Sequence, residues 1–92
     1  MIKRSHQNMW KQLIKLSKDS EVGLQTQLRK SVANLILERS ISPDMPLPSS
    51  RELAWILEIS RSTVTLVYQR LVDEGFLVSR ERQGYFVNPE LV

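Results

Sequence analysis

Two helix-start signals stand close together in this sequence, at Ser49 and Ser60. Ser49 is followed three residues later by Glu52, the spacing of a capping box in which each side chain binds the other residue's backbone amide. This predicts a short helix that ends near Glu58. Ser60 predicts the start of a longer helix that ends at Gly75, the residue type expected in a left-handed conformation after a helix. Two helices joined by so tight a turn form a helix-turn-helix arrangement.

An upstream helix and a downstream hairpin complete the predicted fold. Residues 24–39 repeat apolar side chains at helical spacing, whereas residues 41–48 contain three of the four prolines and cannot continue that helix. Residues 76–79 and 85–87 are β-prone and flank a polar turn at residues 80–84, which predicts a hairpin. We therefore expect a mainly α fold with a small β-hairpin, a winged helix-turn-helix with a three-helix core.

This domain is expected to span residues 24–88, followed at 89–92 by a linker or C-terminal tail and preceded at 1–23 by a basic arm. The chain has a formal net charge of +3, and the arm supplies the excess because residues 1–18 contain no acid. Apolar residues at helical spacing predict a short amphipathic helix in the arm. It would pack on the domain or on a neighbouring subunit, or alternatively bind a membrane surface. The basic residues are Lys3, Arg4, Lys11, Lys15 and Lys18, and the apolar ones are Met9, Trp10, Leu13, Ile14 and Leu16.

The sequence has few of the residue types that most enzymes and metal sites need. It has no cysteine and a single histidine, His6, which argues against thiolate or histidine-rich metal sites and a serine-histidine-aspartate triad. Its three glycines lie far apart and form no phosphate-binding loop. No apolar run approaches the roughly 20 residues that cross a bilayer. We therefore expect a cytoplasmic binding protein that is not an enzyme and holds no metal or cofactor in this chain.

The third predicted helix has the properties of a helix that reads DNA bases. Ser60 to Arg70 contains no acidic residue that would repel phosphates. At 100° per residue around the helix, four positions point away from its apolar stripe. One of them, Leu66, could contact a thymine methyl group or a partner subunit. The four positions are Ser62, Thr65, Leu66 and Gln69. In contrast, Trp55 and Tyr68 are expected to be packing residues rather than stacking platforms for single-stranded nucleic acid.

Arginines stand where they could hold a duplex. Arg61 lies in the first turn of the third helix and could contact a phosphate or a guanine edge, or it could be a solvated surface residue. Arg51 begins the second helix and could clamp the same backbone stretch, or pair within the chain with Glu52 or Glu58. In the hairpin turn, Arg80 and Arg82 could reach the minor groove, or form a solvated turn.

Several strings of residues together resemble the DNA-binding domain of GntR-type bacterial transcriptional regulators. The resemblance covers residues 24–88 and is greatest for the MocR branch, in which an aminotransferase-like domain that binds pyridoxal phosphate follows the winged helix. It therefore implies that this chain is the DNA-reading part of a longer regulator, with the cofactor-binding lysine beyond Val92. The strings are Leu47 to Ala54, Ile59 to Val64, Tyr68, Leu71, Glu74 to Leu77, and Gly84 to Val87.

The resemblance also implies positions that contact operator DNA, with the wing around Gly84 entering the minor groove. These positions are Arg51, Ser60, Arg61, Ser62, Thr63 and Thr65. The chain departs from the family pattern in three places. Asp44 and Met45 stand where relatives usually carry glycine, Leu66 stands where many carry a basic residue, and the wing is more cationic and lacks a second glycine.

These observations predict sequence-specific binding of double-stranded DNA by a homodimer, on two half-sites about one helical turn or a multiple of it apart. Arg61, Ser62, Thr65 and Gln69 would read bases, while Arg51, Ser50 and Thr63 would position the backbone. The alternative is a winged helix that binds another protein, through the arm and Leu66, and has only weak and sequence-insensitive affinity for DNA.

Overall fold

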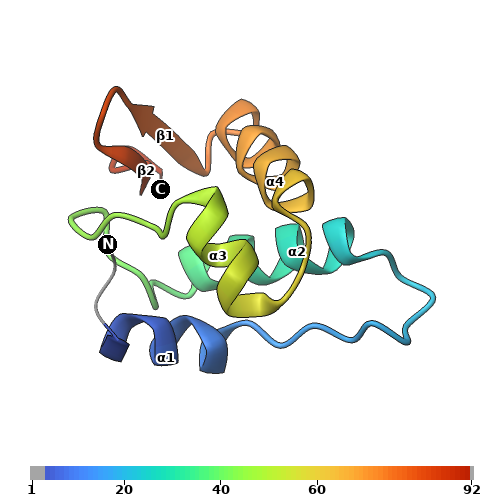
Figure 1. Cartoon of the computed structure of the whole chain (residues 1–92). Helices are drawn as coiled ribbons and strands as arrows, with labels where there is room; N and C mark the ends of the chain where they lie inside the picture. The colour runs from blue at the N-terminus through green and yellow to red at the C-terminus, as the bar shows by residue number, and fades with distance from the viewer. Residues whose placement is uncertain (1–3, 92) are drawn as a thin grey trace.

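The computed structural model describes residues 4–91, with side chains from residue 7 onward, and shows four helices followed by a two-stranded hairpin (Figure 1). Lys3 of the predicted basic arm lies outside the described residues, as do the side chains of Arg4 and His6. No helix within residues 4–91 is long and apolar enough to cross a membrane. The elements are α1 (Arg4–Leu13), α2 (Leu24–Leu37), α3 (Ser50–Leu57), α4 (Arg61–Asp73), β1 (Leu77–Arg80) and β2 (Gly84–Val87).

Serine caps set the starts of α3 and α4, as the sequence predicts. The Ser49 hydroxyl accepts a 3.1 Å hydrogen bond from the Glu52 amide, and the Ser60 hydroxyl accepts one of 3.3 Å from the Thr63 amide. Between the two helices the backbone turns at Glu58, which has a left-handed φ of 57°. The predicted helix-turn-helix is therefore confirmed.

The ends of α2 and α4 follow local backbone geometry. After α4, Gly75 takes a φ of 85°, the left-handed conformation predicted for it. Helix α2 ends two residues earlier than predicted, because Arg39 is left-handed with a φ of 60°. The amide of Ser40 then bonds back to the carbonyl of Leu35, which closes the helix end.

The core lies where α2, α3 and α4 meet. Leu28 and Val32 of α2, Leu53 of α3 and Tyr68 of α4 are completely buried. Burial of Tyr68 confirms its prediction as a packing residue. The prediction for Trp55 is wrong, because its side chain is 70% exposed: it lies on the side of α3 opposite the buried stripe.

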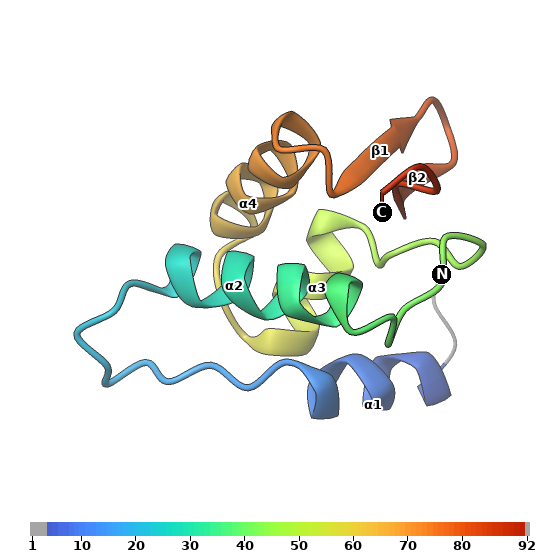
Figure 2. The same cartoon turned by 180° about the vertical axis from the view of Figure 1, so that it is seen from behind.

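Helix α1 packs on the domain and adds to the same core. Trp10 and Ile14 are 1% and 2% exposed, and α1 contacts α3. The amphipathic helix predicted in the arm is therefore present and packs on the domain itself. Figures 1 and 2 show α1 on the opposite side of the molecule from the hairpin.

The hairpin pairs β1 and β2 in antiparallel register, with Leu77 opposite Val87 and Arg80 opposite Gly84. Leu77 and Val87 are buried, so the base of the hairpin joins the core. The Leu47 amide donates a 2.8 Å hydrogen bond to the Tyr85 carbonyl, which ties the proline-rich segment to β2. Three core helices with an attached hairpin make a winged helix-turn-helix, as predicted.

Candidate nucleic-acid interface

Helix α4 presents an exposed, uncharged face to solvent. Its buried positions, Val64, Val67, Tyr68 and Leu71, fall on one side. The positions predicted to point outward are all exposed, and none of them is acidic. They are Ser62, Thr65, Leu66 and Gln69. This face is therefore free to approach another molecule.

Hydroxyl groups gather at the first turn of α4. The Ser60 hydroxyl lies 2.8 Å from the Thr63 hydroxyl and 3.2 Å from the Ser62 hydroxyl, and the Thr65 hydroxyl donates a 3.0 Å bond to the Arg61 carbonyl. Ser60 and Thr63 thus form the cap that holds the helix start. The first amides of a helix carry partial positive charge, so this end attracts anionic groups such as phosphates.

A hydrogen bond joins the starts of α3 and α4. The Arg61 Nε donates to the Ser50 hydroxyl at 3.3 Å, and Arg61 is exposed. This contact uses one of the five N–H groups of the guanidinium, whose planar array of donors suits phosphate and guanine. Arg51 is the next residue after Ser50 and is also exposed. The structure therefore brings Ser50 and Arg61 together, and the spacing of two helix starts in the sequence did not predict this contact.

The tip of the hairpin carries the wing residues. Arg80 places its guanidinium carbon 4.6 Å from the centre of the Phe86 ring, within the range of a cation–π contact. Arg82 is exposed and left-handed with a φ of 65°, and Gly84 has a φ of 101° that glycine adopts without strain. Figures 1 and 2 show the hairpin next to α4, on the side of the molecule away from α1, and α4 contacts β1.

Two acidic residues, Asp73 and Glu74, stand at the C-terminal end of α4, and the carboxylate of each accepts hydrogen bonds. Arg29 of α2 makes two 2.7 Å hydrogen bonds to the Glu74 carboxylate, which raise the pKa of Arg29 and lower the pKa of Glu74. The Asp73 carboxylate accepts a 3.0 Å hydrogen bond from the Gln69 side-chain amide. Neither contact was predicted from the sequence, although the four-residue spacing of Gln69 and Asp73 is a signal for a helical side-chain pair.

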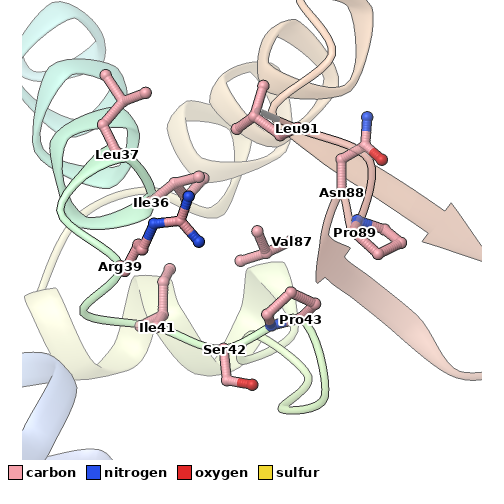
Figure 3. A pocket seen from close by; sticks show the side chains of 10 residues that line it. All are labelled: Ile36, Leu37, Arg39, Ile41, Ser42, Pro43, Val87, Asn88, Pro89 and Leu91. Carbon is pink, nitrogen blue, oxygen red and sulfur yellow. The ribbon is translucent and has the colours of Figure 1, made fainter.

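Two pockets open on the surface, one away from the exposed face of α4 and one on it. The larger, of about 310 Å³, is formed by the end of α2, the segment after it, the end of β2 and the residues that follow, and Arg39 extends into it (Figure 3). The other, of about 270 Å³, lies on the exposed face of α4 itself, where Gln25 of α2 and the α4 residues Leu66, Gln69 and Asp73 line it. Neither pocket is lined by a lysine, a cysteine or a histidine. Within the described side chains, no group of three residues could hold a metal ion.

The fold and this face define a class of protein, the winged helix-turn-helix DNA-binding domains of transcriptional regulators. Residues 24–87 match the sequence model described as bacterial regulatory proteins, gntR family, and the chain belongs to this family.

Relatives of this chain are regulators of the same type. It is 35% identical over 78 residues to the pyridoxine biosynthesis transcriptional regulator PdxR of Corynebacterium glutamicum, a match that covers 85% of this chain and 17% of PdxR. It is also 35% identical over 75 residues to the probable rhizopine catabolism regulatory protein MocR of Rhizobium meliloti, covering 82% of this chain and 15% of MocR. The chain therefore spans less than a fifth of the length of these two relatives.

Solved structures share the fold. YtrA of Sulfolobus acidocaldarius, a GntR-family transcription factor, superposes with a TM-score of 0.77 at 35% identity, covering 86% of this chain and 83% of YtrA. The DNA-binding domain of AraR, in complex with operator ORX1, superposes with a TM-score of 0.68 at 28% identity, covering 79% of this chain and 90% of that domain. The chain is thus a GntR-type DNA-binding domain, with the predicted fold and the predicted class of function.

Proposed function

We propose that this chain binds double-stranded DNA in a sequence-specific manner, with α4 in the major groove. The observation that carries the proposal is the exposed face of α4, where the outward side chains of Ser62, Thr65, Leu66 and Gln69 carry hydroxyl, amide and apolar groups and no charge. Direct readout of base edges needs such groups, because they form hydrogen bonds and methyl contacts that depend on the base. Arg61, Ser62, Thr65 and Gln69 read bases in this arrangement.

Other residues position the duplex without reading it. Ser50, Arg51, Ser60 and Thr63 stand at the starts of α3 and α4, where hydroxyls, helix amides and a cation suit phosphate contacts. The wing lies next to α4, and Arg80, Arg82 and Gly84 at its tip enter the minor groove. The DNA-binding domain of AraR, solved in complex with an operator, supports DNA binding by a domain of this fold.

The functional unit we propose is a homodimer on two half-sites, acting in the cytoplasm as part of a longer regulator. The PdxR and MocR relatives, of which this chain spans less than a fifth, support the last of these points, that the chain is part of a longer regulator. The mechanism is binding, without a chemical reaction. If a pyridoxal phosphate domain follows, the cofactor lysine lies beyond Val92. The two pockets described above are lined by no lysine that could form the internal Schiff base, so they do not fit this cofactor.

The test begins by selecting duplexes from a random pool with the whole chain, then titrating the selected site. Arg61→Ala should weaken specific binding by roughly 1 to 3 kcal/mol. Arg39→Ala is the matched control, because Arg39 is an exposed arginine after α2, in a pocket that no residue of α4 or of the wing tip lines. We expect that control to leave the affinity unchanged.

A salt titration separates DNA binding from the alternative of a protein-binding module. Neutralised phosphates release counterions, so log affinity should fall steeply with log salt concentration. A chain that enriches no sequence, binds all duplexes weakly and loses nothing on Arg61→Ala would contradict the proposed function.

A further inference from the structure

The exposed face of α4 ends in a hydrogen bond that fixes one of its polar side chains. Gln69 and Asp73 are both exposed and lie one helical turn apart. The Gln69 Nε2 donates to the Asp73 Oδ1 at 3.0 Å. Glu74, the acid next to Asp73, accepts two hydrogen bonds from Arg29 instead. The two acids at this end of α4 therefore have different partners, and only Asp73 acts on the exposed face.

The chemistry of this pair fixes which way the Gln69 amide faces. The terminal torsion of a glutamine is broad and roughly two-fold, so a free side chain presents its oxygen and nitrogen in either order. An ionised carboxylate can only accept hydrogen bonds. Asp73 therefore favours the orientation in which the amide nitrogen faces it and disfavours the one in which the amide oxygen does.

A glutamine held in this way presents a fixed pattern to a partner. Its carbonyl oxygen is an acceptor, and the second hydrogen of Nε2 is a donor beside it. In the major groove, adenine offers the complementary pair, the N7 acceptor and the N6 donor, whereas guanine offers two acceptors. Reading adenine with both groups requires the amide in one orientation only.

We propose that Asp73 is a positioning residue that orients Gln69 to read an adenine in each half-site. This inference rests on the proposed function, because it needs α4 to lie in the major groove. Asp73 itself touches no base, and its negative charge lowers the affinity for every duplex equally. Its effect is on the preference for adenine.

The experiment uses the whole chain and the duplex selected with it. Each adenine of the half-site is replaced in turn by 7-deazaadenine, which lacks the N7 acceptor and leaves base pairing intact. The quantity measured is the ratio of dissociation constants for the modified and unmodified duplexes, so the charge effect of a variant cancels. We expect one adenine per half-site to give a ratio of about ten, in the range of a lost base contact. Gln69→Ala should reduce that ratio to one.

Variants at Asp73 test the orientation. Asp73→Ala should reduce the ratio at that adenine by about twofold, the size expected for one exposed helical side-chain pair, while the chain still binds DNA. Asp73→Glu keeps an acceptor-only group within reach of Gln69 and should restore most of the ratio. Both substitutions are at an exposed position, and circular dichroism with a thermal midpoint checks that the fold is retained.

The outcomes separate this inference from the proposed function. An Asp73→Ala chain that keeps the full ratio, or an Asp73→Glu chain as low as Asp73→Ala, overturns the orienting role while sequence-specific binding stands. Sensitivity to 7-deazaadenine that persists in Gln69→Ala overturns the assignment of adenine to Gln69. A chain that selects no duplex at all contradicts the proposed function itself.

Discussion

The hydroxyl of Tyr68 donates a 2.7 Å hydrogen bond to the carbonyl of Pro48, and both residues are buried. The bond ties α4 to the segment that leads into α3, so it holds the two helices of the helix-turn-helix in register. In Tyr68→Phe the ring still fills its site, but the buried carbonyl loses its donor. We expect the free energy of unfolding to fall by about 1 to 3 kcal/mol, measured by urea denaturation. An unchanged midpoint would show that the bond contributes nothing to stability.

The same hydroxyl makes stability sensitive to alkaline pH. Burial raises the pKa of Tyr68, with smaller contributions from Tyr85 and Glu52. A raised pKa in the folded state means that the folded protein holds this proton more tightly than the unfolded chain does. Stability from this group is therefore complete below the unfolded pKa of about 10 and declines as the pH rises above it. Urea denaturation at several pH values should show this decline in the wild type and a weaker one in Tyr68→Phe; equal slopes in both proteins would assign it to other groups.

The two tryptophans should differ sharply in their contribution to stability. Trp10 of α1 is 1% exposed and lies in the core, whereas Trp55 of α3 is 70% exposed. Trp10→Ala leaves a large cavity and should lower the free energy of unfolding by about 3 to 5 kcal/mol. Trp55→Ala, the matched control, should change it by no more than about 0.5 kcal/mol. Similar losses in both variants would contradict the packing of α1 on the domain.

Local signals in the sequence predicted most of the fold, because caps and turns depend on neighbouring residues. Ser49 and Ser60 specify the starts of two helices, and Gly75 specifies the end of the second. Trp55 shows where this reasoning fails. Helix α3 has only eight residues, so its sequence alone did not show whether a large apolar side chain such as Trp55 lies on the buried or the exposed side. Only the packing of the helix decides this.

The candidate site, like the fold, has some features that the sequence predicted and others that it did not. The exposed face of α4 was predictable, since helical periodicity alone separates Leu66 and Gln69 from the buried stripe. The contacts of Arg61 with Ser50 and of Arg80 with Phe86 were missed. Each joins residues from different elements, so its geometry depends on how those elements pack. The roles of these residues in DNA binding stay predictions.

The pairing of Arg29 with Glu74 should stabilise the protein at neutral pH and not in acid. Arg29 holds the pKa of Glu74 below its ordinary value, chiefly through the hydrogen bonds between them. A lowered pKa in the folded state gives stability that is present above the unfolded pKa of about 4.3 and is lost as the pH falls through the folded value. Arg29→Gln should therefore lower the thermal midpoint at pH 7, with a difference from the wild type that shrinks near about pH 3. Lys30→Gln, an exposed change of the same charge on α2, is the control and should show no such pH-dependent difference.

Leu66 offers a test of how α4 lies on DNA that does not depend on knowing the operator. Its side chain is 56% exposed on the face that we place against the duplex. Leu66→Arg adds a cation there, so it should strengthen binding to any duplex and steepen the slope of log affinity against log salt by about 1. Leu37→Arg is the matched control, because Leu37 is 59% exposed and lines the pocket at the end of α2, away from that face. Both variants carry the same added charge, so a difference between their slopes reports the position of the cation and not the net charge. If both substitutions steepen the slope equally, α4 does not lie against the duplex in the way proposed.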